Sequence, residues 1–524
     1  MEDYIPGTKI KIFWFTEEEL YGCLPEGFVF HGEKPLYHQL LSIVFSLQFE
    51  DGVGLFHDMG TGKSYTAINI ARAKGIQDKI LVISVNASLE NWKNEFKLYA
   101  GGEYKVQVVS GSRDDKEELL GQDADVYIIN YEGTFIRKRL ERDVFGRKKR
   151  REFQFDEMIL NGLDRDWNYL ILDESRSVMN IQAYQTRIAM RLAFQSKFRV
   201  ILSGLPIVKT LEEIFSQQFC VDLGREFSSS FGKFKKTYFQ KLFLCPKCKE
   251  IQAKCTCKLM GRIAYPIWVA KPESEELVHE KMYQQGIRFS KRECLDLPDK
   301  VYVTRTLEMK GDAKAFYQKL KAQKSATVIT KHNKVELTAM LMRFMQICGG
   351  WLKAEDEVKE FKDNTKLQEL MYLLDGDLAE EKVAIVSCFV AEQEGIYNHL
   401  IEQGIKTEKV TSKSEDDVFM IVERFNNDPT IQCLVLSHKM GSKAINVRAS
   451  YMIFFSQNFD KDSNMQIEDR IHGIVGKRGI EGKSSTYIRF IIRDSVDERV
   501  EEILANNARL ISGVVEGKKL GDYL

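Results

Sequence analysis

The chain has 524 residues, which is too long for one hydrophobic core and is typical of two or three domains. Lys and Arg together number 76, as do Asp and Glu, so any grip on an anionic polymer needs a local basic patch. The N-terminus lacks the basic and apolar regions of a signal peptide, and no run of residues is apolar over a membrane-spanning length. We expect a protein that is not secreted, has no membrane partner, and is cytoplasmic, or nuclear in a eukaryotic host.

Short apolar runs bounded by turn residues recur through the first two hundred residues, and each has the length of a strand. They cover residues 53–56, 80–85, 126–130, 169–172 and 200–202. Amphipathic stretches such as 65–73 and 89–98 lie between them. This alternation predicts a largely parallel sheet with helices on both faces.

The sequence then becomes helical and irregular from about residue 213 to residue 361, with a helix expected over 334–347. Beyond it the earlier alternation returns, with strands expected at 383–387, 433–437, 451–455 and 487–492. We therefore predict the α/β class, with two parallel-sheet lobes and a helical insertion or bridge between them.

A glycine-rich segment lies directly between the first strand and the first helix, with the sequence His57-Asp58-Met59-Gly60-Thr61-Gly62-Lys63-Ser64. Glycines on either side of Thr61 allow backbone N–H groups to turn toward phosphate oxygens at the start of a helix. Lys63 would neutralise the β- and γ-phosphates, and Ser64 would ligate Mg²⁺. The pattern predicts an ATP-binding loop, although the outer glycine of the general pattern is His57 here.

An acidic pair, Asp173-Glu174, follows the apolar strand at 169–172. A nucleotide loop needs a carboxylate for its metal, normally at the end of a neighbouring buried strand. We expect Asp173 to hold Mg²⁺ through water, and Glu174 to orient and deprotonate the attacking water. An acidic pair after an apolar strand is also common as an ordinary strand end, so this prediction depends on the loop.

These segments resemble, in order, the motifs of the Swi/Snf branch of superfamily 2 helicase-like ATPases. Gln39 stands in the position of the glutamine that reads adenine, and the glycine-rich loop is similar to motif I. Further similarity is carried by Asn91-Trp92 with Glu95-Phe96, Asn130-Tyr131-Glu132, Asp173-Glu174-Ser175-Arg176 with Asn180, and Leu202-Ser203-Gly204-Leu205-Pro206. The resemblance implies two RecA-like lobes that clamp ATP between them.

The second lobe continues the series. Lys366-Leu367, Ser387, Ser437, Gly441 and Ile445-Asn446 resemble the segments through motif V, and Gln466-Ile467-Glu468-Asp469-Arg470-Ile471-His472 resembles motif VI. The resemblance implies that Arg470 reaches the γ-phosphate and stabilises the charge that develops there. Three positions depart from the family pattern, namely Arg176, Leu205 and Gly473, and they leave room for altered coupling or weak turnover.

Four cysteines, Cys245, Cys248, Cys255 and Cys257, have the spacing of a tetrahedral Zn²⁺ site without an open position. We expect a structural site, which would either stabilise the fold of the inserted block or contact DNA. The expected domains are an N-terminal extension over 1–30, an ATP-binding lobe over 31–225, an insertion with the zinc knuckle over 226–300, a helical bridge over 301–360, and a second lobe over 361–524.

A dense basic run, Arg147-Lys148-Lys149-Arg150-Arg151, follows the motif Ib segment. Because motors of this family carry the nucleic-acid track on the face that bears this motif, the run would lie near the phosphate backbone. The same run is equally typical of a solvated loop.

The function expected from these features is that of an ATP-dependent translocase or remodeller of double-stranded DNA, with RNA not excluded. It would act as a monomer that another protein recruits. Two alternatives stay open, which are a nucleic-acid-binding scaffold with a weakened ATPase and a strand-separating helicase. The compact chain is typical of a motor from a bacterium, phage or large virus.

Overall fold

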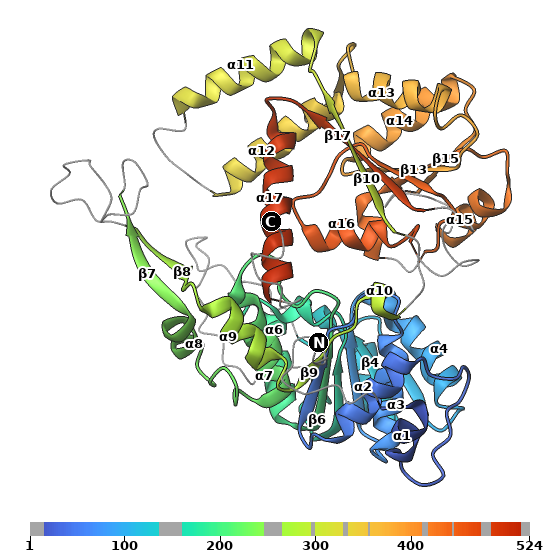
Figure 1. The fold of residues 1–524 in the computed structure, drawn as a ribbon, viewed down its shortest axis with the longest axis vertical. Coiled ribbons are helices and arrows are strands. Elements are labelled where there is room, and N and C mark those ends of the chain that lie inside the picture. The colour runs from blue at the N-terminus through green and yellow to red at the C-terminus, as the bar shows by residue number, and fades with distance from the viewer. Residues whose placement is uncertain are drawn as a thin grey trace. The chain divides into compact units, whose positions relative to one another are not determined.

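The computed structural model describes residues 15–135, 160–245, 265–294, 299–327, 334–354, 357–410, 418–442, 445–472 and 484–514. The chain divides into two compact units, residues 1–294 with 509–524, and residues 295–508. Each unit is built around one sheet whose neighbouring strands are all parallel (Figure 1). None of the helices in the described ranges is long and apolar enough to cross a membrane.

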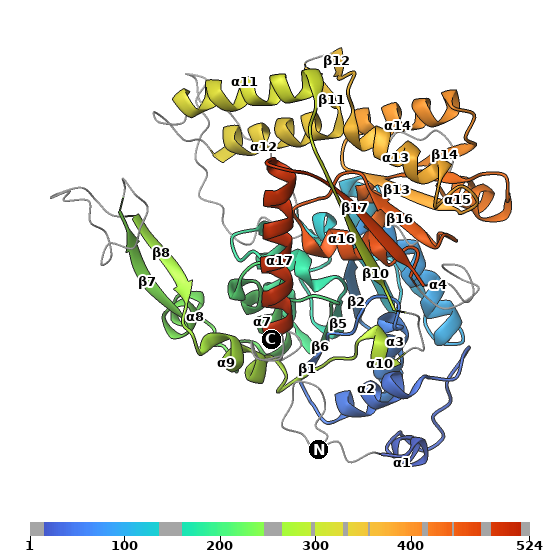
Figure 2. The ribbon, with the colours of Figure 1, turned by 45° about the horizontal axis from the view of Figure 1, so that its top comes forward.

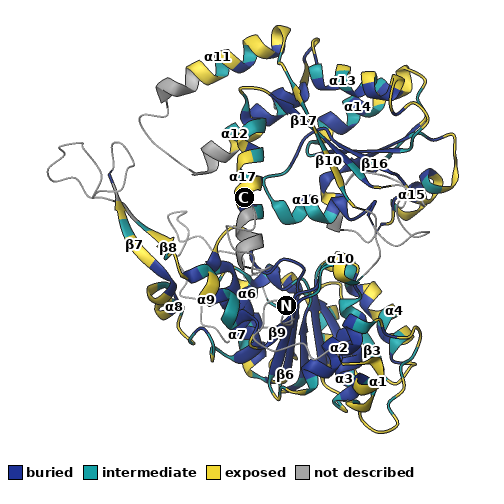
Figure 3. Ribbon diagram, in the orientation of Figure 1, coloured by how far each residue is buried: buried dark blue, intermediate teal, exposed yellow. Residues whose placement is uncertain are grey.

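The sheet of the first unit has seven strands in the order β3-β4-β2-β5-β6-β1-β9. Their bounds are β1 Gly52–Leu55, β2 Ile80–Ser84, β3 Val106–Val109, β4 Val126–Asn130, β5 Trp167–Leu172, β6 Ser196–Leu202 and β9 Gly286–Ile287. β1 and β2 are buried along their whole length, and β5 and β6 are buried except at the second residue of each, which agrees with the continuous apolar runs of a sheet covered on both faces (Figure 3).

Helices cover both faces of this sheet. The helices of this unit are α1 Glu17–Gly22, α2 Tyr37–Leu47, α3 Lys63–Ala73, α4 Leu89–Tyr99, α5 Arg113–Gly121, α6 Tyr184–Phe194, α7 Ile214–Asp222, α8 Phe231–Tyr238, α9 Ser274–Met282 and α10 Lys291–Cys294, and of these α8 packs on the hairpin β7–β8. α2, α3 and α4 share one apolar cluster with alternate residues of the strands, while α6 and α7 lie against β5, β6 and β1.

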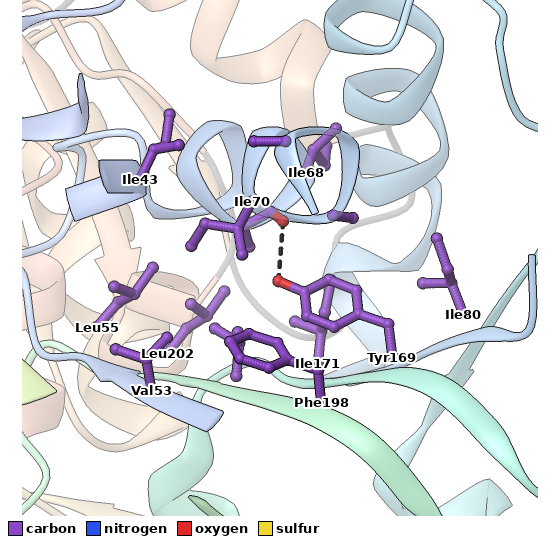
Figure 4. Packing of buried hydrophobic residues seen from close by; sticks show 14 of the residues in the cluster. Ile43, Val53, Leu55, Ile68, Ile70, Ile80, Tyr169, Ile171, Phe198 and Leu202 are labelled. Atoms are coloured by element: carbon purple, nitrogen blue, oxygen red, sulfur yellow. Dashed lines mark hydrogen bonds between the residues drawn. The ribbon is translucent and has the colours of Figure 1, made fainter. Parts of the chain in front are cut away.

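α3 is tied to the central strands by apolar packing and one buried hydrogen bond (Figure 4). The hydroxyl of Tyr169 on β5 donates to the carbonyl oxygen of Ala67 at 3.0 Å, and Ile68 and Ile70 pack in the same cluster. The start of α3 is therefore fixed relative to the end of β5.

The sheet of the second unit has six strands in the order β10-β17-β16-β13-β15-β14. Their bounds are β10 Val301–Leu307, β13 Val383–Ser387, β14 Thr407–Val410, β15 Cys433–Ser437, β16 Tyr451–Phe454 and β17 Thr486–Ile492. The helices are α11 Gly311–Thr327, α12 Lys334–Gly349, α13 Thr365–Asp375, α14 Val390–Glu402, α15 Val418–Asn427, α16 Lys461–Glu468 and α17 Val496–Val514. α13 and α14 pack on one face of the sheet, and α15 and α16 on the other.

The expected α/β class with two parallel sheets is confirmed, and the expected strands lie within one or two residues of the observed ones, except that β6 begins earlier. The region expected to be a helical insertion and bridge contains strands as well as helices. It contributes β9 to the first sheet and β10 to the edge of the second, and it forms two hairpins, β7 Phe239–Leu244 with β8 Tyr265–Ala270, and β11 Trp351–Ala354 with β12 Glu357–Glu360. β10 alternates between exposed and half-buried residues, so its sequence carries only the weak signal of an edge strand.

Buried charged groups lie beside β13 and β16 in the second unit. The ammonium of Lys366 pairs with Asp497 at 2.7 Å and donates to the carbonyl oxygen of Phe455 at 2.8 Å. The carboxyl of Glu392 on α14 accepts a hydrogen bond from the Ser456 hydroxyl at 2.6 Å. Burial raises the pKa of Glu392 to about 7, against the favourable Ser456 hydrogen bond and the charge of Lys366.

We expect Glu392 to make unfolding depend on pH. Its folded pKa lies above the unfolded value, so the free energy of unfolding falls as pH rises from about 4.5 to about 7, by at most about 1.4 kcal/mol per pH unit. Glu392→Gln should flatten this slope relative to the wild type in urea denaturation at pH 5, 6, 7 and 8. Glu402→Gln, at the exposed end of α14, is the control. Equal slopes for the wild type and Glu392→Gln would contradict the assignment.

Candidate functional site

The glycine-rich loop runs from the end of β1 to the first residue of α3. Gly60 and Gly62 both have the left-handed backbone that favours glycine, with φ of +79° and +82°. A Cβ atom at Gly62 would lie 2.2 Å from Nε2 of Gln39, so a larger residue there would displace the Gln39 amide from the loop. Gly62 is the N-cap of α3, and the helix therefore begins with its N–H groups directed toward the loop.

The ammonium of Lys63 points into this loop. Its Nζ donates to the carbonyl oxygens of His57 at 2.9 Å and Asp58 at 3.2 Å, and the Thr61 hydroxyl donates to the same Asp58 oxygen at 2.8 Å. A cation held by two carbonyl oxygens inside a ring of backbone amides is suited to an incoming polyphosphate, which offers it stronger anionic acceptors.

Two side chains of α2 fix the opposite side of the loop. Nε2 of His38 lies 2.8 Å from the carbonyl oxygen of Thr61, and Nε2 of Gln39 donates to the same oxygen at 3.0 Å. Oε1 of Gln39 accepts the backbone N–H of Leu36 at 2.9 Å. Gln39 is thus an anchor of the loop in this structure, and its role in reading adenine stays a prediction.

His57 stands where the general pattern has a glycine, and it is completely buried. Its Nδ1 accepts the backbone N–H of Phe289 at 3.0 Å, and its Nε2 lies 3.0 Å from the hydroxyl of Ser42. Because that hydroxyl already donates to the carbonyl of His38, Nε2 carries the proton of a neutral ring. Burial, and then the charges of neighbouring groups, hold the pKa of His57 well below its usual range.

The acidic pair lies at the end of β5, as expected. Oδ2 of Asp173 accepts hydrogen bonds from the Ser84 hydroxyl at 2.6 Å and from the Trp92 indole at 2.8 Å. Glu174 has a left-handed backbone with φ of 48°, which is rare outside glycine and is typical of strained functional sites. The carboxylate of Asp173 is therefore oriented by neighbours on β2 and α4.

Glu95 lies on α4, one turn beyond the Trp92 that donates to Asp173. Its carboxyl interacts with the hydroxyl of Ser64 and the charge of Asp173, and its Oε1 accepts from Asn91 at 2.8 Å. Its Oε2 is buried without a hydrogen-bond partner within the described ranges. Burial, and secondarily the charge of Asp173, raises the pKa of Glu95. The hydroxyl of Ser64 opposes this rise in the pKa of Glu95. Hydroxyl and carboxylate oxygens such as those of Ser64 and Asp173 are the ligands that Mg²⁺ prefers.

Arg288, which follows β9, is a site residue that the sequence analysis missed. Its buried guanidinium donates to the carbonyl oxygens of Phe56 at 2.9 Å and Gly204 at 3.1 Å, and it pairs with Asp58 at 3.1 Å. The second carboxylate oxygen of Asp58 accepts the backbone N–H of Lys291 at 3.0 Å. More than two hundred residues separate Arg288 from the loop, and no local pattern could have connected them.

The segment after the acidic pair is connected to the segment after β6 through α7. The Ser175 hydroxyl donates to Oε1 of Gln217, and the amide of Gln217 donates to the carbonyl oxygens of Pro206 and Glu213, each at 2.7 Å. The carboxyl of Glu213 accepts a hydrogen bond from the backbone N–H of Val208 at 2.7 Å. The positive charge of Arg176 also favours the ionised form of this carboxyl.

In the second unit, Arg470 lies just after α16 and is largely buried. Its Nε donates to the carbonyl oxygen of Gln466 at 3.1 Å, and its own carbonyl accepts the backbone N–H of Val447 at 3.0 Å. The neighbouring Glu468 and Asp469 lie 3.4 and 3.2 Å from Nζ of Lys300. These contacts fix the backbone and the stem of Arg470.

Several predicted site residues lie outside the described ranges. They are the basic run 147–151, Gly473, and the cysteines at 248, 255 and 257; Cys245 is described and buried. The nucleic-acid and zinc assignments that depend on them stay predictions.

A family model for the SNF2-related domain matches residues 38–353, which is more than half of the chain and includes the loop, the acidic pair and Arg288. The chain belongs to the SNF2-related domain family. The predicted family resemblance is thereby confirmed.

Relatives of this SNF2 chain include proteins from distant organisms. It is 22% identical over 546 residues to the ATP-dependent helicase FUN30 of Saccharomyces cerevisiae, covering 90% of this chain and 45% of that protein. It is also 22% identical over 485 residues to an uncharacterized ATP-dependent helicase of Mycoplasma pneumoniae, covering 87% and 40%. The chain therefore spans less than half the length of either relative.

Among solved structures, the SWI2/SNF2 ATPase core of Sulfolobus solfataricus in complex with dsDNA is similar, with 20% identity and a TM-score of 0.40. The similarity covers 93% of this chain and 94% of that one.

Arg288→Met should loosen the loop. The change leaves two buried carbonyl oxygens without their donor, which costs about 2–3 kcal/mol. We expect a lower melting temperature and roughly tenfold weaker binding of a fluorescent ATP analogue, the factor that corresponds to about 1.4 kcal/mol. Arg292→Met, an exposed position on α10, is the matched control. Unchanged nucleotide affinity in Arg288→Met would show that Arg288 does not order the loop.

Proposed function

We propose that this SNF2 chain is a nucleic-acid-dependent ATPase that moves along or remodels double-stranded DNA. The observation that supports it most is the built geometry of the first unit, in which Lys63 points into the loop and Ser84 and Trp92 orient Asp173 at the end of β5. A phosphate-binding loop and a metal-binding carboxylate are the parts that hydrolysis of ATP needs. The names of the relatives, which include ATP-dependent helicases, support the same class of activity.

Each of the first unit's residues takes a role that its surroundings favour. The backbone amides from Gly60 to Gly62 would cradle the phosphates, and Lys63 would exchange its carbonyl acceptors for phosphate oxygens. Ser64 and Asp173 would hold Mg²⁺, which neutralises charge on the β- and γ-phosphates when bound. Glu174 would orient and deprotonate the attacking water.

In the second unit we assign Arg470 to the charge that develops on the γ-phosphate. Its Nε donates to the carbonyl oxygen of Gln466, and Val447 binds its backbone carbonyl, so both the side chain and the backbone are oriented. A fixed cation directed at developing charge is an effective way to lower such a barrier.

The DNA assignment, the zinc site and the place of action extend this proposal. Duplex DNA is favoured because the motifs of this chain resemble those of Swi/Snf motors, and the family match supports that resemblance. Cys245, Cys248, Cys255 and Cys257 would hold a structural Zn²⁺. The protein would act in the cytoplasm or nucleus, as a monomer recruited by another protein.

Lys63→Ala should reduce Mg²⁺-ATP hydrolysis to background, because the phosphates lose their main cation. Glu174→Gln should still bind the fluorescent ATP analogue but not hydrolyse ATP, since only the base is lost. Phosphate release is measured with no nucleic acid, duplex DNA, single-stranded DNA and duplex RNA. Lys197→Ala, at the opposite end of the sheet, is the control. The motor proposal fails if no nucleic acid stimulates the wild type.

Arg470→Ala should lower DNA-stimulated turnover by about 10³-fold or more, the range measured for arginines that act on a transferred phosphoryl group. ATP affinity should change far less, because the developing charge exists only during hydrolysis. Displacement of a triplex-forming strand without separation of the duplex would distinguish translocation from helicase activity. Equal turnover in the wild type and Arg470→Ala would contradict the proposal that Arg470 stabilises the charge on the γ-phosphate.

A further inference from the structure

The first unit carries an arm that extends away from its parallel sheet. We define the basic arm as the described residues 231–245 and 265–271, which comprise α8 and the antiparallel strands β7 and β8. In Figures 1 and 2 the two strands project beyond the helices that cover the sheet. None of the ATP-site residues named above belongs to it.

The basic arm is a strong local concentration of positive charge. Its described residues include Lys233, Lys235, Lys236, Lys241 and Lys271 and no acidic residue. In the sequence as a whole, residues 231–271 contain ten Lys or Arg and one Glu, although the complete chain has a net charge of +0. The segment's net charge of +9 is therefore balanced by an excess of acidic residues elsewhere in the chain.

An aromatic cluster anchors the arm to the body of the first unit. The ring of Phe234 on α8 lies 5.2 Å from that of Phe215 on α7 and 5.4 Å from that of Phe227, and Tyr238 completes the cluster at 4.9 Å. Phe234 is fully buried. Since an isolated two-stranded hairpin is only marginally stable, this cluster gives the arm the support that its strands lack.

The outer surface of the arm presents lysines next to exposed aromatic rings. The ammonium of Lys241 lies 5.5 Å from the ring of Phe243, and that of Lys235 lies 5.3 Å from the ring of Trp268. Phe243 and Trp268 are 43% and 36% exposed. In the part of the chain that the structure describes, Lys235 pairs with Glu212 at 2.9 Å, while Lys233, Lys236 and Lys241 have no acidic partner.

We propose that the basic arm binds the phosphate backbone of duplex DNA, at a site separate from the ATP-binding loop and the acidic pair. Three exposed lysines without acidic partners in the described ranges are suited to bind a polyanion. A lysine ammonium is a point charge, so it can bind a phosphate without the fixed two-point geometry that arginine requires. Six-residue strands extend about 20 Å, a length over which a DNA strand presents several phosphates. The choice of duplex DNA as the polyanion rests on the proposed function. The positive charge of the arm is independent of that proposal.

The arm also accounts for how a chain with no net charge would bind DNA. A protein with no net charge gains little long-range attraction to DNA, so binding must come from charges gathered on one surface. The arm places such a surface on the unit that carries the ATP-binding loop. Binding through it is therefore predicted to be independent of base sequence and strongly dependent on salt.

The test compares two triple variants with equal charge change. In the arm variant, Lys233, Lys236 and Lys241 are replaced by Gln. In the control variant, Lys79, Lys105 and Lys197 are replaced by Gln; these exposed lysines lie at the N-terminal ends of the strands of the parallel sheet. Binding of a fluorescent duplex to the full chain is measured by anisotropy across a series of salt concentrations, and ATPase activity is measured without DNA.

For the arm variant we expect the plot of log affinity against log salt to become shallower by about 2.7, which is roughly 0.9 for each phosphate that the protein no longer neutralises. Affinity at moderate salt should fall at least about tenfold, while the control variant keeps the wild-type slope. ATPase activity without DNA should stay at the wild-type value in both variants, because the arm contains none of the ATP-site residues.

Equal slopes for the arm variant and the wild type would overturn the proposal, as would equal reductions of affinity in the arm and control variants. Polyglutamate and duplex RNA serve as competing polyanions. Loss of binding to either of these without loss of duplex DNA binding would assign the arm to that partner instead. If the arm variant loses DNA binding but DNA does not stimulate the wild-type ATPase, the arm proposal stands and the proposed function fails.

Discussion

The conformation of the glycine-rich loop depends on buried hydrogen bonds from separate parts of the first unit. α2 supplies His38 and Gln39, which both approach the carbonyl oxygen of Thr61. The segment after β9 supplies Arg288, whose guanidinium reaches the backbone at Phe56 and Gly204. Because an unpaired buried carbonyl is costly, these contacts hold the loop in one conformation.

The same contacts suggest how this SNF2 chain accommodates its unusual residues. His57 replaces a glycine but, as a neutral ring, serves as a buried bridge between Ser42 and Phe289. Leu205 lacks the hydroxyl of the family pattern, yet the neighbouring Pro206 is tied to Ser175 through Gln217. Hydrogen bonds through Gln217 therefore connect the segment after the acidic pair to the segment after β6.

Charge is distributed unevenly in this protein, and the distribution separates two tasks. The proposed ATP site has the acidic pair Asp173 and Glu174 directly after β5, where a divalent cation would bind. The basic arm gathers lysines on an exposed hairpin, where a polyanion of many phosphates can lie along it. A chain of zero net charge can thus attract a cation at one site and a polyanion at the other.

The sequence alone determined most strands of the two parallel sheets, though not β3 or β14, together with the loop from Gly60 to Ser64 and the acidic pair after β5, because strand periodicity and turn chemistry are local properties. It did not determine β9, β10 or Arg288, since a two-residue strand, an edge strand and an interaction across two hundred residues have no local pattern. Only the tertiary structure decided that Arg288 reaches the backbone at Phe56 and Gly204, and that β8 places Trp268 opposite Lys241 in one arm. Such groupings arise when distant segments pack together, and the sequence order does not record them.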